Sequence, residues 1–471
     1  MTTRAQEPDY PWVLLSLLAG FAFLWPAVMN GMPFLFYDTP GYLGGANALA
    51  HGLWDAPLDW TAAPVMLGRS IYYGAFLYIS LLTGSFWPAA IAQAMVSGFC
   101  VVTFLRYFLP IRATAILVGA AILGVALLTL TSLPFFSSFM MPDLFSGLAL
   151  LSATALLLFW RQDHWHRRAF WIGVTAAAAL FHPTNVPILS AVVVMGLIFC
   201  ALLRMPRPWA AAGVVMLAAS TGMVGELIFS AGVNHALGHP PIRPPFVTAR
   251  LTADGPGTRY LKETCPDNGF LLCRYAARLP LPSDHFLWSK SSVDGVFRSA
   301  PPEERRQLAA DEPRFVIATL RHLPVQTVGA LFIGARKQLT RNRLNEFNYG
   351  WIERQFFHNN MPAAVVADVA QTRAYRLAMP TRDLSWLGRN LAAIATIICL
   401  WAMVDRRIDR RLRLAVAMIL TGVLVNAFIC GGLSGAHDRY QARVLWLLPW
   451  TAYLAIAAWA LRTRSPATPP A

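Results

Sequence analysis

Charged residues are scarce in this chain: 13% of its 471 residues are Asp, Glu, Lys or Arg, and 56% are hydrophobic. A soluble domain carries about 25% charged residues. No charged residue lies between Arg69 and Arg106, or between Arg112 and Asp143. Uncharged runs of this length predict transmembrane helices, so the sequence indicates a polytopic, all-α membrane protein.

Several signatures of soluble enzymes are also missing. The chain has no GxGxxG ahead of a helix, no GxxxxGK[ST], no HExxH and no GxSxG, which argues against a cofactor-dependent redox enzyme or an ATPase. The net charge of +15 sits largely in short loops, where it orients helices. We therefore expect membrane lipids as partners, and no nucleic acid.

Ten apolar segments are long enough to be candidate spans. They are 11–31, 87–105, 113–132, 143–160, 169–181, 185–203, 208–231, 387–404, 412–430 and 444–461. The apolar segment 71–84 is shorter and suits an interfacial helix. If it does not cross, nearly all short basic loops fall on one side. The positive-inside rule then favours ten helices with both termini cytoplasmic.

This topology places the polar motifs of the chain on the opposite, extracytoplasmic side. They include the large segment 233–386, which separates an N-terminal membrane module, 1–232, from the C-terminal helices, 387–471. Cys265 and Cys273 lie in this segment, and outside the cytoplasm they are expected to form a disulfide; two reduced thiols are the alternative. Two further stretches of the segment, 314–339 and 345–360, predict helices lying against the membrane domain.

Asp38 is the sharpest local signal. It follows the first span in Phe36-Tyr37-Asp38-Thr39-Pro40-Gly41-Tyr42. An outward carboxylate there suits a general base or a metal ligand such as one for Mg²⁺ or Mn²⁺. Asp-Thr-Pro-Gly is equally good turn chemistry. The residues alone leave both interpretations open.

Three more ionisable positions have two interpretations each. Asp143, at the start of the fourth span, is either a helix-terminal anion or a second carboxylate that converges with Asp38 on a metal or on the acceptor. His182, in the turn His182-Pro183-Thr184-Asn185, either contacts a phosphate or metal or is structural. Glu226 lies within the seventh span, where an ionisable residue is costly, and pairing with an arginine of the outer segment is one explanation.

The segment His437-Asp438-Arg439-Tyr440, followed by Arg443, precedes the last span. Arginine binds phosphate through bidentate hydrogen bonds. Interfacial anchoring by Tyr and Arg is the alternative. An outward arginine pair runs against the inside bias of the other basic residues, which favours a binding role.

These features resemble the GT-C class of integral-membrane glycosyltransferases, to which the protein O-mannosyltransferases and the lipid A aminoarabinose transferases belong. The stretch from Phe36 to Tyr42 is similar to that class's Asp-x-x-x-Tyr first loop. The stretch 69–106 is similar to its juxtamembrane helix and second span, 173–189 to its glycine-containing helix and polar break, and Arg439-Tyr440 to its late outer Arg-Tyr.

The resemblance implies transfer of a sugar from a polyprenyl-phosphate donor to a lipid, glycan or protein acceptor on the extracytoplasmic face. It implies Asp38 as base or metal ligand, Asp143 as a second carboxylate, and Arg439 as the ligand of the lipid phosphate. Tyr42, His182, Tyr440 and Arg443 are further candidate substrate-binding residues. The composition suggests a bacterial inner membrane with the large segment in the periplasm. A lipid or glycan transporter and a non-catalytic assembly subunit are the rival interpretations.

Overall fold

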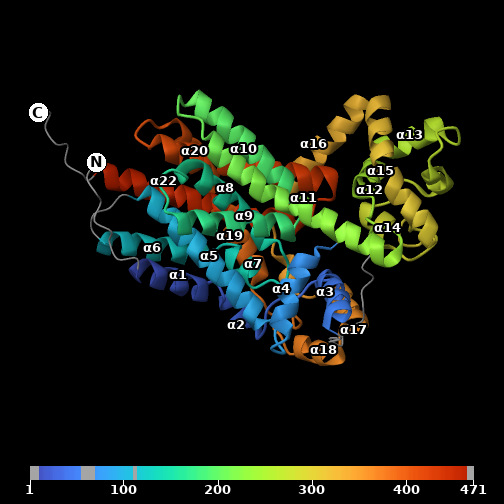
Figure 1. Cartoon of the computed structure of the whole chain (residues 1–471), viewed down its shortest axis with the longest axis horizontal. Helices are drawn as coiled ribbons and strands as arrows, with labels where there is room; N and C mark the ends of the chain where they lie inside the picture. Colours follow the sequence, from blue (N-terminus) through green and yellow to red (C-terminus); the bar gives the residue numbers. More distant parts are fainter. Residues whose placement is uncertain (1–9, 55–68, 110–113, 464–471) are drawn as a thin grey trace, which may run out of the picture.

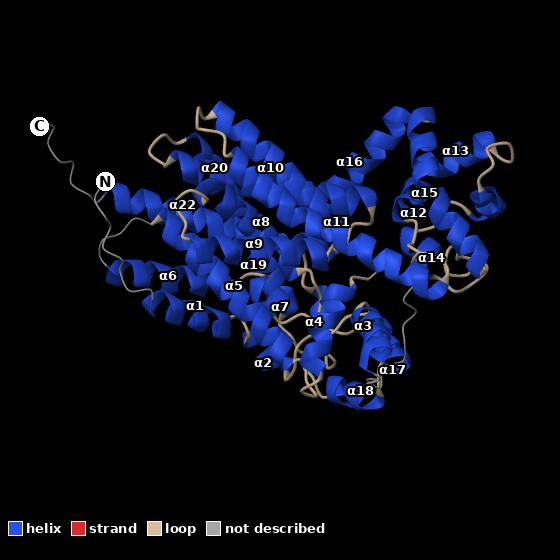
Figure 2. Cartoon of the chain, viewed as in Figure 1, coloured by secondary structure: helices blue, strands red, loops and turns tan. Residues whose placement is uncertain are grey.

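The described residues form helices and no strand (Figure 2). The computed structural model describes residues 10–54, 69–109 and 114–463. Within these ranges the one β-type pairing is an isolated bridge between Phe34 and Phe139. The predicted all-α class is therefore confirmed for the part of the chain that the structure describes.

Seven helical stretches are long and apolar enough to cross a membrane. They are α1 with α2 (Tyr10–Ala22 and Trp25–Asn30), α5 (Trp87–Phe108), α10 (Asn185–Leu202), α11 (Trp209–Leu237), α19 (Thr381–Val404), α20 with the π-helical turn η4 (Arg410–Ala427 and Phe428–Gly432), and α21 with α22 (Asp438–Leu445 and Leu447–Thr463). Large apolar side chains on them face outward, such as Phe21 (60% exposed) and Leu217 (72%). Such a surface suits contact with lipid, and the chain is a multi-pass membrane protein.

Three other predicted spans are shorter helices: α6 (Thr114–Thr129), α8 (Leu144–Phe159) and α9 (Trp165–Phe181), of 16, 16 and 17 residues. At a rise of about 1.5 Å per residue they cover roughly 24–26 Å, whereas the hydrocarbon core is about 30 Å thick. Nearly every residue of α8 is buried, so it runs through the centre of the bundle. The number of ten spans stays a prediction.

Helices α15 (Pro302–His322) and α16 (Pro324–Thr340) pass the same test together, but they meet at an angle of 113°. The prediction of one amphipathic helix over 314–339 is therefore wrong, because this stretch is divided between α15 and α16. Pro324 has no N–H to continue α15, and proline is favoured at the first position of a new helix.

The short helix α4 (Ile71–Leu81) has 11 residues, about 16 Å at the usual rise, which suits the interfacial placement expected for it. The Ser70 side chain caps it by accepting from the Tyr73 N–H. Helix α3 (Thr39–Trp54) precedes it and packs against it.

The segment 233–386 divides between two hydrophobic cores. Residues between Ile242 and Leu323 build a core of their own, from α12 (Phe246–Asp254), α13 (Pro256–Thr264), η2 (Leu271–Arg278), α14 (Ser283–Trp288) and α15. We call α12–α15 the outer unit; its helices lie together at one side of Figure 1. Residues from Leu344 to Met379 join the main core instead, with η3 (Asn345–Phe347), α17 (Trp351–Asn360) and α18 (Ala363–Ala370).

The two ends of the bundle differ in content. Helix α1 begins and α22 ends at the same end of the molecule (Figure 1). Side chains from four segments interact away from that end. These segments are the turn after α2, the start of α8, the end of α9 and the first turn of α21. The short helix α7 (Leu133–Ser137) packs beside them against α8.

Candidate functional site

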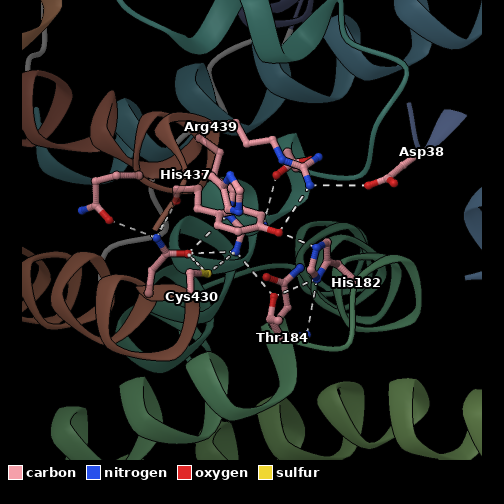
Figure 3. Close-up of polar contacts among 12 residues, drawn as sticks. Asp38, His182, Thr184, Cys430, His437 and Arg439 are labelled. Atoms are coloured by element: carbon pink, nitrogen blue, oxygen red, sulfur yellow. Dashed lines mark hydrogen bonds and ion pairs between the residues drawn. The ribbon is translucent and has the colours of Figure 1, made fainter. Parts of the chain in front are cut away.

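Three arginines and two aspartates gather where these segments meet. Figure 3 shows part of this group, with Arg439 directed toward Asp38. Asp38 lies between α2 and α3, and Asp143 lies directly before α8. Arg439 and Arg443 both belong to α21, and Arg69 stands just ahead of α4. We call these five side chains the arginine–aspartate cluster. Two of the arginines are four residues apart on one helix, so they lie on the same face of α21.

Arg439 joins the two carboxylates. Its Nη2 lies 3.4 Å from Asp38 Oδ2, and its Nη1 lies 3.6 Å from Asp143 Oδ2. Arg69 Nη2 donates to the other oxygen of Asp38, at 2.5 Å. Asp38 is therefore held between two guanidinium groups that come from distant parts of the chain.

Arg443 occupies the inner end of the cluster. Its Nη1 donates to Asp143 Oδ1 at 3.2 Å, and its Nη2 donates to Asn426 Oδ1 at 3.0 Å and contacts Cys430 Sγ at 3.2 Å. Its side chain is fully buried. A buried cation is tolerated only with such partners. The donors of Arg443 are therefore occupied by Asp143, Asn426 and Cys430, and its role is structural.

Aromatic rings cover the arginines. The Arg439 guanidinium carbon lies 4.4 Å from the ring centre of Phe36 and 4.9 Å from that of Tyr440. The guanidinium of Arg443 lies 5.3 Å from the Tyr440 ring. Tyr440 thus packs between the two cations as a cation–π partner.

His182 borders the buried end of the cluster. Its Nδ1 lies 2.7 Å from Thr184 Oγ1, and its Nε2 lies 3.5 Å from Arg443 Nη1. Burial, and then the charge of Arg443, lower the pKa of His182 well below its ordinary value. The imidazole is therefore neutral near pH 7 and contacts the arginine without adding a positive charge.

Exposure separates the members into two groups. The side chains of Asp38, Arg69 and Arg439 are 14%, 25% and 10% exposed, whereas those of Asp143 and Arg443 are 1% and 0% exposed. An incoming molecule reaches the first three side chains. Asp143 and Arg443 act on it only by fixing the position of Arg439.

Tyr42 is buried behind the cluster, at 4% exposed, with its ring edge-on to Tyr73. Burial raises the pKa of its hydroxyl. Tyr42 lies one helical turn after Asp38, and its buried hydroxyl is near enough to Arg69 and Asp38 for their charges to act on it. A substrate contact, expected from sequence, would require it to become exposed.

Asp143 does not act as a helix cap. It stands at the N-cap position of α8 in helical backbone geometry, and its side chain makes no capping hydrogen bond. Its carboxylate instead receives Arg439 and Arg443. The structure brings Asp143 and Asp38 together on Arg439. Their convergence on a metal or an acceptor stays a prediction.

Sequence reasoning missed several members of the site. Arg69 and Asn426 have no predicted role, although a polar side chain such as Asn426 inside an apolar span is a signal in itself. Glu346 also belongs here: its Oε1 accepts from the backbone N–H of Arg439 at 3.2 Å. Burial raises the pKa of Glu346 to about 7.

The donor set does not fit a resident divalent metal as it is arranged. Among the described residues no three His, Cys, Asp or Glu side chains come together as a metal-binding group. Asp38 and Asp143 are bridged by a guanidinium, which holds the place between them that a cation would take.

Two predicted pairings lie outside the cluster. Glu226 of α11 forms an ion pair with Arg243 of the segment leading to the outer unit, and this explains its charge within an apolar helix. Cys265 and Cys273 form a disulfide inside the outer unit.

The chain was compared with protein-family models, with curated proteins and with solved structures, and none of them matches it.

Proposed function

We propose that the protein is a membrane glycosyltransferase of GT-C-like architecture, with up to ten spans. It moves a sugar from a polyprenyl-phosphate donor to a lipid, glycan or protein acceptor. The observation that carries the proposal is the accessible pair of arginines, Arg69 and Arg439, on either side of Asp38. The proposal includes a bacterial inner membrane, which the composition suggests, with the cluster facing the periplasm, which the distribution of basic loops favours.

The charge of the cluster suits a phosphate. Three guanidinium groups face two aspartates, so the cluster keeps an excess of positive charge. Arginine presents planar paired donors that match phosphate oxygens. A lipid phosphate approaching from the exposed side meets Arg69 and Arg439 first.

The accessible carboxylate suits the acceptor. The acceptor oxygen would attack the anomeric carbon while the bond from that carbon to the phosphate oxygen breaks. The hydroxyl proton passes to Asp38, and the lipid phosphate leaves with the bonding electrons. The arginines stabilise the negative charge that develops on the leaving phosphate.

Burial gives each remaining candidate a role. Asp143 and Arg443 position Arg439, because neither has a side-chain surface for substrate. His182, next to Arg443, supports the same position. Tyr440 keeps the two guanidinium groups apart as a shared aromatic partner.

The test is mass spectrometry of lipids and glycans in membranes of cells that lack the protein, complemented with wild type, Asp38→Asn or Asp383→Asn. Asp383 is an exposed acidic residue at the start of α19 and serves as the matched control. We expect a polyprenyl-phosphate sugar to accumulate, and a glycosylated product to vanish, in the uncomplemented and Asp38→Asn cells alone. The mass of the sugar would identify the donor.

Each variant must also be recovered folded from the membrane, as judged by its thermal unfolding in detergent. Wild-type product levels in Asp38→Asn cells would contradict the proposed chemistry. Unchanged lipid and glycan profiles in cells without the protein would favour transport or assembly instead.

A further inference from the structure

Helix α16 presents two very different faces. Its buried residues Thr327, Ala330, Gly334 and Gln338 recur every three or four positions, so they form one stripe. This stripe packs against η4 at the end of α20. A Cβ at Gly334 would lie 2.3 Å from the carbonyl oxygen of Gly431, so the two backbones touch. α16 is therefore fixed at the level where a membrane-spanning helix ends.

The opposite face of α16 is apolar and largely exposed, although the ring of Phe332 lies 5.5 Å from that of Phe428 in η4. Val325, Val328, Phe332 and Ile333 are 83%, 42%, 62% and 50% exposed. Their spacing of three, seven and eight residues from the first member puts them on one side of the helix. We call them the apolar stripe. A contiguous exposed apolar surface indicates an interaction site.

The C-terminal end of α16 is strongly basic. Arg336 and Lys337 are exposed on its last turns, and Arg341 and Arg343 follow directly. No acidic residue occurs between Glu312 and Glu346. Within the described residues none of these four side chains forms a salt bridge. Lys337 acts at longer range on the carboxylate of Asp254 in α12, and the exposed side chains of Arg336 and Lys337 keep surface for an anion.

We propose that α16 is a lipid-binding helix of the membrane surface, with the apolar stripe among the acyl chains and Arg336 and Lys337 on the phosphates of anionic phospholipids. Apolar residues on one side and cations beside them are the composition of helices that lie in the membrane interface. The contact with η4 sets the depth of α16 in the membrane, because η4 stands at the end of a membrane-spanning helix. This inference does not depend on the proposed transferase activity.

The apolar stripe is tested by depth-dependent quenching. Phe332→Cys and Val325→Cys, labelled with an environment-sensitive fluorophore, are reconstituted as full-length protein in vesicles with brominated acyl chains. Val293→Cys is the control, since Val293 of the outer unit is 79% exposed. Wild type treated with the same label measures the background, because the four free cysteines are buried.

We expect strong quenching at positions 332 and 325 and none at 293. Equal fluorescence at all three positions with and without bromine would overturn the insertion of α16.

The basic end is tested with phosphatidylglycerol. Wild type, Arg336→Gln/Lys337→Gln and the control Lys262→Gln/Lys290→Gln are placed in vesicles of phosphatidylcholine and phosphatidylglycerol, and the phospholipid that co-purifies is identified by mass spectrometry. Each cation near an anionic surface contributes about fivefold in binding, so we expect phosphatidylglycerol enrichment to fall by roughly 25-fold in the first variant only. The same enrichment in all three proteins would overturn the headgroup assignment.

Discussion

Arg443 is the most deeply buried charge of the site, and it stabilises the cluster only because its partners surround it. Asp143, Asn426 and Cys430 take up its donors on one side. Removing one member of a buried ion pair leaves the other charge desolvated. The pair therefore makes the position of Arg439 depend on contacts that no substrate touches.

The first prediction concerns this pair. Arg443→Met should destabilise the protein by about 3–5 kcal/mol, because Asp143 keeps only the longer contact to Arg439. Asp143→Asn/Arg443→Met should lose less than the sum of the two single losses, because both charges are gone. Thermal unfolding in detergent measures this, with the exposed Arg389→Met as the control. Strict additivity would show that the two side chains do not interact.

The second prediction concerns Glu346. Its pKa is raised to about 7 by burial, so the folded protein binds a proton that the unfolded chain has released above its ordinary pKa of about 4.3. The stability that Glu346 contributes is full below that ordinary pKa and is lost as pH rises through 7.

Glu346→Gln should therefore flatten the fall in melting temperature between about pH 4.5 and about pH 7. The histidines His182 and His437, whose pKa values are lowered by burial, act in the opposite sense at lower pH in both proteins. An identical pH profile for wild type and Glu346→Gln would contradict this assignment.

For single residues, the sequence predicted which residue types come together, but not which of them are accessible to substrate and which are structural. Asp38 and Asp143 read alike as outward carboxylates beside spans. Only packing reveals that one is accessible and the other is enclosed by α8 and α21. Arg69 was not assigned because its partner lies 31 residues away, beyond the reach of local pattern.

At the level of helices, the close contact between α16 and η4 requires a glycine on each of them, because a larger side chain would not fit. Gly334 and Gly431 each approach the other's backbone oxygen, at 2.3 Å and 2.5 Å from an added Cβ. Small residues allow helices to approach this closely within membranes. The position of α16, and with it the apolar stripe, follows from this approach.

The third prediction compares two glycines of α16. Gly334→Ala should destabilise the protein by about 1–3 kcal/mol through overpacking. Gly329→Ala meets nothing within 4 Å and should be neutral or stabilising by about 0.5–1 kcal/mol, since alanine is the better helix former. Melting temperatures in detergent decide between them, and a loss at Gly329 equal to that at Gly334 would disprove the packing argument.

Helix type was predictable because uncharged apolar runs leave few alternatives, and seven of the ten predicted spans coincide with helices long enough to cross. The remainder depended on tertiary contacts. α8 is short yet buried on nearly every side, so it is stabilised by neighbouring helices and not by lipid. Pro324 predicts a break between α15 and α16, but the sequence does not predict the angle of 113° between the two helices.

For the whole molecule, the two hydrophobic cores are the main division. The core of the outer unit is separate from the one that holds the cluster. The sequence boundary at 386 misses this division, because the part of the segment after Leu344 packs into the main body. Hydrophobicity alone does not say which core an apolar residue joins.

The fourth prediction follows from this division. The disulfide between Cys265 and Cys273 closes a short loop within the outer unit, and its loss should cost about 2–3 kcal/mol. Cys265→Ser/Cys273→Ser should increase protease cleavage within 242–323 while helices of the main core stay protected. Cleavage that spreads evenly over both cores would show that they unfold as one unit.

Asp143 and Arg443 are 300 residues apart in the chain, and this separation has a consequence for biosynthesis. Because synthesis proceeds from the N-terminus, the carboxylate at the start of α8 reaches the membrane long before α21 has left the ribosome. An ionisable group in that setting is costly until it is paired. A nascent chain interrupted before α21 therefore has the Asp143 carboxylate at the start of its central helix without Arg439 and Arg443, and only synthesis of α21 supplies these two partners.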